Sequence, residues 1–256
     1  MINFISGDCV EEMDKLIEEG VKVNKIITSP PYNIIRGNLD DRGYDKYNDD
    51  KTTDEYIDWT VNIFNKFDKL LEKDGCVLYN MSYGAENTTC MSLTVADVIR
   101  NTNFTLADIM VWKKKTAMPN NVSKNKLTRI VEFIYVFVRK DELKTFEINK
   151  EVIGKRKTGQ KIYKVYYNFI EAKNNDGSTS LNKATYSTDL MSKLFDIYVK
   201  PDDVVLDPFG GTGTTGCYCY LNGNDCYSIE LSEQQVEHSK ERLEKLKENI
   251  EKDKNW

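Results

Sequence analysis

Residues 204–216 read VVLDPFGGTGTTG, a short apolar run followed by a turn that is rich in glycine. The apolar run is typical of a buried strand, and a helical pattern follows the turn. Glycines at such a turn let the backbone approach a ligand, and the N-terminus of the following helix favours negative charge. The stretch therefore predicts a strand–turn–helix unit that either binds a ligand or only packs a helix closely against a strand.

Three classes of ligand can be tested against this turn. A nucleoside-triphosphate loop requires G-x-x-x-x-G-K-[ST], and the absence of lysine from residues 207–225 excludes it. A dinucleotide site requires G-x-G-x-x-G, which residues 211–216 match, and Glu230 at the end of the next predicted strand supplies the acidic partner. An S-adenosylmethionine site reads D-x-F-x-G-x-G and uses the same acid. The residues that match it are Asp207, Phe209, Gly211 and Gly213. Spacing alone leaves the last two classes open.

A second turn, SPPY at residues 29–32, follows the predicted strand at residues 23–28. Proline fixes φ and has no N–H to donate, so two consecutive prolines end a strand in a rigid turn. Taken by itself, the motif fits a simple strand-ending turn as well as it fits a functional site.

The order of predicted elements indicates an α/β fold. Strands alternate with helices along most of the chain, which favours a mostly parallel, doubly wound sheet with helices on both faces. The apolar runs at residues 104–112 and 129–138 predict a paired ribbon that contributes an antiparallel strand.

Composition restricts the class of protein. The chain has 256 residues, 40% of them hydrophobic and 30% charged, which suits a soluble globular protein. No apolar run approaches a membrane span, and the N-terminus lacks a signal-peptide pattern, so we expect a cytoplasmic protein without membrane contact.

The six cysteines form no C-x-x-C pair, and the one histidine, His238, lies in a charged helical pattern. These features argue against a structural zinc site and against a Ser-His-Asp hydrolase, and we predict no metal.

Charge is unevenly distributed along the chain. Residues 112–173 contain 16 Lys or Arg against 6 Asp or Glu, whereas the whole chain carries a net charge of −5. A basic segment in an acidic protein predicts one surface for a polyanion, although charge alone also fits a solvated loop region.

The presence of both TSPPYN and DPFGGTGTT in one chain resembles the amino-group DNA methyltransferases of bacteria and phages. The order of the motifs matches the permuted β class, in which the catalytic S/D/N-P-P-Y motif precedes the cofactor motif and a target-recognition region lies between them. The resemblance spans nearly the whole chain. It implies a Rossmann-like methyltransferase fold, S-adenosylmethionine as cofactor and double-stranded DNA as substrate. The implied parts are a catalytic part at residues 1–138, a small basic target-recognition insertion at 139–184, and a cofactor-binding part at 185–256.

The resemblance also implies which residues contact each ligand. The segment NKATYSTDL departs from the family's H-P-x-x-x-P pattern, so Thr185 and Tyr186 are placed there by position. The expected cofactor contacts are Asp8, Cys9, Thr28, Thr185, Tyr186, Asp207, Phe209, Gly211, Thr212, Gly213, Thr214 and Glu230. The expected DNA contacts are Lys113, Lys115, Asn121, Lys124, Lys126, Arg129, Lys155, Arg156 and Lys157. Trp112, Pro119, Arg129 and Glu132 match the family's region beside the target base.

The expected catalytic residues are Ser29, Pro30, Pro31 and Tyr32. The lone pair of an exocyclic amino group is delocalised into the base, so the nitrogen becomes nucleophilic only when acceptors hold its N–H groups. The Ser29 hydroxyl and the Pro30 carbonyl can supply these acceptors, and the Tyr32 ring can stack on a base flipped out of the duplex.

Several alternatives remain at this point. Serine at the first motif position is typical of cytosine-N4 enzymes and Asp or Asn of adenine-N6 enzymes, so Ser29 favours cytosine with adenine as the alternative. A nicotinamide-dependent oxidoreductase is a remote alternative that gives no role to the SPPY motif. The resemblance further suggests a cognate restriction endonuclease and a homodimer as possible partners.

Overall fold

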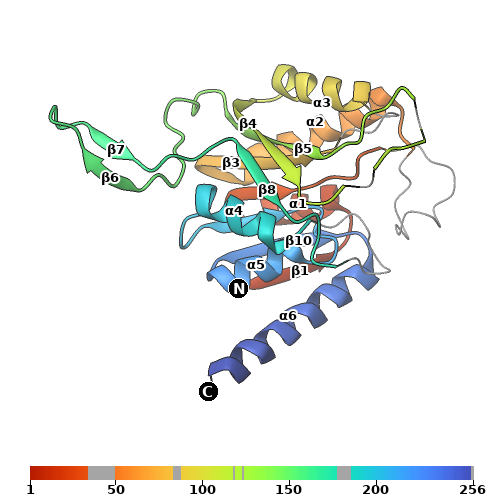
Figure 1. The fold of residues 1–256 in the computed structure, drawn as a ribbon. Coiled ribbons are helices and arrows are strands. Elements are labelled where there is room, and N and C mark those ends of the chain that lie inside the picture. The colour runs from red at the N-terminus through yellow and green to blue at the C-terminus, as the bar shows by residue number, and fades with distance from the viewer. Residues whose placement is uncertain (34–49, 83–87, 118, 123, 178–185, 255–256) are drawn as a thin grey trace.

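The computed structural model describes residues 1–33, 50–82, 88–117, 119–122, 124–177 and 186–254. Within them, one large sheet of eight strands forms the centre of the protein, in the order β1-β10-β9-β2-β3-β5-β4-β8 (Figure 1). Its strands are β1 (Ile2–Ser6), β2 (Val23–Thr28), β3 (Leu71–Met81), β4 (Phe104–Lys114), β5 (Val131–Arg139), β8 (Phe169–Ala172), β9 (Val204–Asp207) and β10 (Asp225–Glu230).

The sheet is mostly parallel. Strand β1 pairs with β10, β10 with β9, β9 with β2 and β2 with β3, all in parallel. Strand β5 is antiparallel to both of its neighbours, β3 and β4. The predicted doubly wound α/β sheet with an antiparallel strand is thus confirmed, and the predicted ribbon is the β4–β5 pair.

Helices cover both faces of the sheet and define two cores. On one face lie α1 (Cys9–Glu18), α2 (Thr53–Leu70) and α3 (Thr88–Asn101), whose buried residues join the first core. On the other face lie α4 (Thr188–Tyr198) and α5 (Thr214–Asn222), which join the second core. The last helix, α6 (Glu233–Lys254), packs on α5, β1 and β10. No helix among the described residues is long and apolar enough to cross a membrane.

Aromatic packing fixes α2 on the sheet. The ring of Phe64 lies at a centroid distance of 5.2 Å from Tyr79, 5.5 Å from Phe104 and 4.9 Å from Phe137. All four side chains are buried, and edge-on aromatic pairs add to the free energy of burial. A capping box between Thr52 and Glu55 fixes the start of α2. Helix α2 therefore holds its N-terminal turns at a defined position beside the end of β2.

The basic segment between β5 and α4 contains two different structures. Strands β6 (Val152–Lys155) and β7 (Lys161–Tyr163) form a separate antiparallel hairpin, which projects away from the main sheet (Figure 1). Strand β8 returns to the main sheet and pairs in parallel with β4. The hairpin is therefore the part of the predicted insertion that stands apart from the central sheet.

Candidate active site

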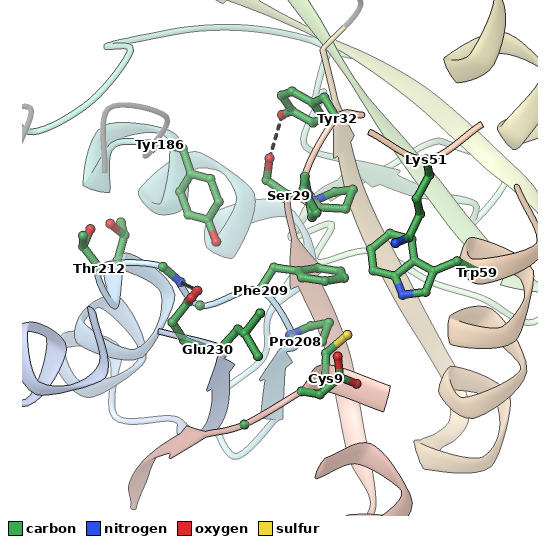
Figure 2. Close-up of a pocket in the computed structure, with 18 residues that line it drawn as sticks. Cys9, Ser29, Tyr32, Lys51, Trp59, Tyr186, Pro208, Phe209, Thr212 and Glu230 are labelled. Atoms are coloured by element: carbon green, nitrogen blue, oxygen red, sulfur yellow. Dashed lines mark hydrogen bonds between the residues drawn. The ribbon is translucent and has the colours of Figure 1, made fainter. Parts of the chain in front are cut away.

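A cavity of about 310 Å³ opens at the carboxyl ends of β1, β2, β9 and β10, the place where open α/β sheets bind ligands (Figure 2). The loops after these strands supply most of its wall. The cavity brings together twelve of the sixteen residues predicted for catalysis and cofactor binding: Asp8, Cys9, Ser29, Pro30, Pro31, Tyr32, Tyr186, Phe209, Gly211, Thr212, Thr214 and Glu230. The predicted Thr185 lies outside the described residues.

The Glu230 carboxylate is held by backbone groups of two loops. Its Oε2 accepts a hydrogen bond from the Gly211 N–H at 2.9 Å, and its Oε1 accepts one from the Ser232 N–H at 3.0 Å. These bonds join the glycine-rich turn after β9 to the end of β10. An acidic side chain is thereby fixed in the wall of the cavity, where it can accept hydrogen bonds from ligand hydroxyl groups.

Asp207 supports the turn from behind and does not line the cavity. Its side chain is fully buried and accepts hydrogen bonds from Thr28 Oγ1 at 2.8 Å, Tyr186 OH at 2.8 Å, Thr215 Oγ1 at 2.5 Å and the Phe209 N–H at 3.1 Å. Burial raises the pKa of Asp207, and these donors partly offset the rise. Thr28 likewise does not line the cavity. Asp207 and Thr28 hold the glycine-rich turn against β2 and Tyr186.

Tyr186 joins this support to the cavity wall. Its ring lines the cavity while its hydroxyl donates to Asp207 Oδ2 and lies beside the Thr215 hydroxyl, which donates to the same oxygen. Burial, together with the charge of Asp207, raises the pKa of Tyr186 well above its ordinary value. The phenol therefore stays protonated and serves as a hydrogen-bond donor.

Gly213 also acts outside the cavity. It precedes α5 with a φ of 77°, which favours glycine, and an added Cβ would lie 2.7 Å from the Ser239 Cβ and 3.1 Å from Phe4. The glycine thus permits close packing of the turn against α6 and β1.

From α6, Arg242 donates to the Thr212 carbonyl at 3.2 Å and to Thr214 Oγ1 at 3.0 Å. The last helix therefore braces the turn.

Aromatic and apolar groups form the opposite wall. The rings of Trp59 and Phe209 lie 5.6 Å apart, and Trp59 is 5.5 Å from Tyr56. The Tyr56 hydroxyl donates to the Pro31 carbonyl at 2.8 Å, which ties this wall to the proline turn. Burial raises the pKa of the Cys9 thiol, which leaves it a neutral group in the wall.

These groups fit S-adenosylmethionine. Asp8 and Glu230 supply carboxylates for hydroxyl and amine groups, and Phe209 and Trp59 supply flat apolar surfaces for an aromatic base. The acidic side chains also suit a ligand that carries positive charge. When bound, this cofactor supplies an electrophilic methyl group on a sulfonium.

Hydrogen bonds connect the SPPY turn to two residues behind it. Ser29 Oγ lies 2.6 Å from Tyr32 OH (Figure 2). Asn80 Nδ2, at the end of β3, donates to Tyr32 OH at 2.9 Å and to Glu132 Oε2 at 2.8 Å. Asn80 and Glu132 are each only 6% exposed. Lys114 completes the cluster through an ion pair with Glu132.

Sequence reasoning missed Lys51, Trp59 and Asn80. Trp59 lies on the apolar face of a helical pattern and therefore reads as core. Lys51 follows a polar stretch of sequence that has no helical or strand periodicity, and its Nζ lies 5.9 Å from the Trp59 ring centroid. Asn80 sits at the carboxyl end of a predicted strand, and that position was the signal that could have identified it. The cavity also includes Gly7, Pro208, Gly210 and Leu231.

The predicted DNA contacts lie outside the cavity, in two segments. The connection between β4 and β5 carries the half-buried Arg129 and the exposed Asn121, Lys124 and Lys126. The β6–β7 hairpin and its turn carry the exposed Lys155, Arg156 and Lys157. Lys113 pairs with Glu171 at 2.7 Å, and Lys115 pairs with Asp189 at 3.1 Å.

Known proteins share this sequence and fold. The type II methyltransferase M.MwoI of Methanothermobacter wolfeii is 28% identical over 218 residues, which cover 82% of this chain and 29% of that protein. M.Cfr9I of Citrobacter freundii is 25% identical over 264 residues, covering 90% of this chain and 83% of that protein. The chain thus spans less than a third of the first relative. The solved structure of the cytosine-N4-specific PvuII DNA methyltransferase superposes with a TM-score of 0.70 at 18% identity, covering 96% of this chain and 90% of that one.

The fold is that of the Rossmann-like methyltransferases. The DNA methylase family model matches residues 23–241, and the chain belongs to this family of S-adenosylmethionine-dependent N6-adenine and N4-cytosine DNA methyltransferases. Family membership excludes the nicotinamide-dependent oxidoreductase.

Proposed function

We propose that this protein transfers the methyl group of S-adenosylmethionine to the N4 amino group of a cytosine at a specific site in double-stranded DNA. One observation carries the proposal. A single cavity is lined by the cofactor turn, represented by Phe209 and Gly211, and by the SPPY turn, represented by Ser29 and Tyr32. A methyl donor and an amino group can therefore meet in one enclosed site, as group transfer by positioning requires.

The proline turn holds the acceptors for the amino group. Pro30 and Pro31 restrict the backbone, and the Tyr56 bond to the Pro31 carbonyl fixes the turn further. We assign the Ser29 hydroxyl and the Pro30 carbonyl as acceptors for the two N–H groups of the target. Acceptors placed where positive charge develops on nitrogen lower the barrier to transfer.

Tyr32 is the proposed stacking surface for the flipped base. It lines the cavity beside Ser29, and its hydroxyl is held by Ser29 and Asn80. A ring fixed at its hydroxyl end cannot rotate freely, which suits a platform for a base. Tyr32→Ala should therefore lower the methyl-transfer rate at least about tenfold, the loss of one base-stacking contact, with S-adenosylmethionine affinity retained. Single-turnover transfer and calorimetric binding of the cofactor measure the two effects, and an unchanged rate would contradict the stacking role.

Ser29 favours cytosine over adenine in this proposal. A serine hydroxyl at this position is the pattern of cytosine-N4 enzymes in the family that the sequence resembles. Both target amino groups present the same two hydrogens, so adenine N6 is the alternative outcome of the test.

We assign DNA binding to two basic segments, the β4–β5 connection, which lies at the same edge of the sheet as the cavity, and the β6–β7 hairpin, which lies at the other edge. The exposed Lys124, Lys126, Lys155, Arg156 and Lys157 can neutralise phosphates, and Asn121 can contact a base edge. The type II methyltransferases among the relatives support a cognate restriction endonuclease as a partner in the cell. We further propose that the protein forms a homodimer, and size-exclusion chromatography with light scattering tests this oligomeric state.

The reaction product tests the proposal directly. The protein is incubated with labelled S-adenosylmethionine and unmethylated bacterial DNA, and the DNA is digested to nucleosides for mass analysis. N4-methylcytosine is the expected product. N6-methyladenine would overturn the choice of base, and no transfer to any DNA would overturn the proposed reaction.

A further inference from the structure

The cluster behind Ser29 has a defined hydrogen-bond direction. Asn80 Nδ2 carries two hydrogens, and its closest acceptors are Glu132 Oε2 at 2.8 Å and Tyr32 OH at 2.9 Å. Ser29 Oγ lies farther away, at 3.4 Å. An amide nitrogen can only donate, so the Tyr32 oxygen accepts from Asn80. The amide itself is oriented by the Glu132 carboxylate, because that group can only accept.

Among the residues that the structure describes, two acceptors lie within hydrogen-bond reach of the Tyr32 hydrogen. One is Ser29 Oγ at 2.6 Å, and the other is Glu132 Oε2 at 3.5 Å. If Tyr32 donates to Ser29, the Ser29 hydrogen points away from Tyr32. When it points into the cavity, it opposes the N–H groups of a target amine. If Tyr32 donates to Glu132, Ser29 donates to the Tyr32 oxygen and keeps its lone pairs for the amine. At 3.5 Å this contact is longer than a strong hydrogen bond, but the negative charge of Glu132 attracts the positive end of the O–H dipole and so favours the second arrangement.

Burial strengthens this preference. Glu132 is 6% exposed and is held by an ion pair with Lys114, whose ammonium also lies 5.4 Å from the Trp112 ring centroid. A charge shielded from water orients nearby dipoles more strongly than an exposed one. Neither Asn80 nor Glu132 is among the residues that line the cavity, which places both of them behind Ser29 and Tyr32.

We propose that Glu132 and Asn80 are positioning residues that make the Ser29 hydroxyl a hydrogen-bond acceptor toward the target amino group. This inference rests on the proposed function and deepens it. It explains how a serine can replace a carboxylate at this position, because a carboxylate always accepts whereas a hydroxyl must be turned. The cluster supplies that orientation before the base enters.

Glu132→Gln tests the inference with little change in shape. The substitution removes the negative charge, and whichever way the amide is turned an N–H group faces a donor, either Asn80 at the Oε2 position or Lys114 at the Oε1 position. The Tyr32 hydrogen is then held less strongly on the Glu132 side and turns toward Ser29, which turns the Ser29 hydrogen toward the amine. The rate of single-turnover transfer should fall about tenfold to a hundredfold, the range for a hydrogen bond to a charged group, while the affinities for cofactor and DNA remain those of the wild type. Glu171→Gln is the matched control, because Glu171 pairs with Lys113 on a neighbouring strand but is exposed. It should transfer at the wild-type rate.

A double-mutant cycle separates orientation from simple destabilisation. Tyr32→Phe removes the hydroxyl through which Glu132 acts and keeps the ring. The double variant with Glu132→Gln should therefore be little slower than Tyr32→Phe alone, whereas independent structural damage would multiply the two losses.

Two results would overturn the inference. Wild-type transfer by Glu132→Gln, or fully multiplicative losses in the double variant, would show that the cluster does not orient Ser29. Transfer is counted as total label in DNA, whichever base receives it, so a wrong choice of base leaves this test intact. No transfer by the wild type would instead overturn the proposed reaction, and this inference with it.

Discussion

Replacing Gly213 by alanine tests how the glycine-rich turn is built. Gly213 has a φ of 77°, and a non-glycine residue there costs about 1–2 kcal/mol. The added Cβ would also lie 2.7 Å from the Ser239 Cβ, which rotation of that side chain cannot move away. Overpacking of this kind costs about 1–3 kcal/mol more. The expected loss in unfolding free energy is therefore about 2–5 kcal/mol, and each kcal/mol lowers Tm by about 2–4 °C in a protein of this size.

The same substitution should weaken cofactor binding. Ser239 Oγ bonds to the Gly211 carbonyl at 3.2 Å, so relief of the clash shifts the turn that carries Gly211 and Thr212 in the cavity wall. Since a misplacement near 1 Å can cost about a hundredfold at a positioned site, we expect the Kd for S-adenosylmethionine to rise at least about tenfold. Thermal unfolding and isothermal titration calorimetry measure the two effects.

Gly223 provides the matched control on the same helix. It follows the other end of α5 with a φ of 81°, and nothing lies within 4 Å of an added Cβ. Gly223→Ala should therefore lower the unfolding free energy only by the cost of placing alanine at a positive φ, about 1–2 kcal/mol. Its affinity for S-adenosylmethionine should remain that of the wild type. Equal Kd values for the two variants would refute the reasoning that close packing at Gly213 shapes the cofactor turn.

Three further predictions concern other parts of the molecule. Arg242→Ala removes two hydrogen bonds to the turn and should weaken S-adenosylmethionine binding severalfold in calorimetry, with the overall fold retained by circular dichroism. Replacing Lys155, Arg156 and Lys157 together by alanine should weaken DNA binding and reduce the slope of log K against log salt by about 0.9 for each lost phosphate contact, as fluorescence anisotropy can measure. Burial raises the pKa of Asp207 in the folded state. At pH values between its ordinary pKa and this raised pKa, Asp207 is protonated in the folded state and ionised in the unfolded state. Its contribution to unfolding free energy therefore falls as pH rises through that window, and urea titrations of Asp207→Asn should lack this component.

Much of the fold followed from local patterns in the sequence. Apolar runs and helical periodicity predicted the α/β alternation and the β4–β5 pair, because strand and helix burial leave distinct spacings. The basic segment was harder to assign, because the β6–β7 hairpin exposes most of its side chains and has no buried face to set a pattern. The parallel pairing of β8 with β4 depends on residues about 60 positions apart and left no local signal.

The sequence by itself determined the chemical class of the site. SPPY and DPFGGTG each end a strand, and parallel strands bring such ends to one edge of a sheet. Only the tertiary structure decided which residues face the cavity. Asp207 and Thr28 turn toward each other behind the wall, whereas Trp59 from α2 enters it. Likewise, Asn80 and Glu132 reach Tyr32 only because β3 and β5 pair beside β2. Side-chain direction and strand order are set by packing between distant segments, and that information is absent from any short stretch of sequence.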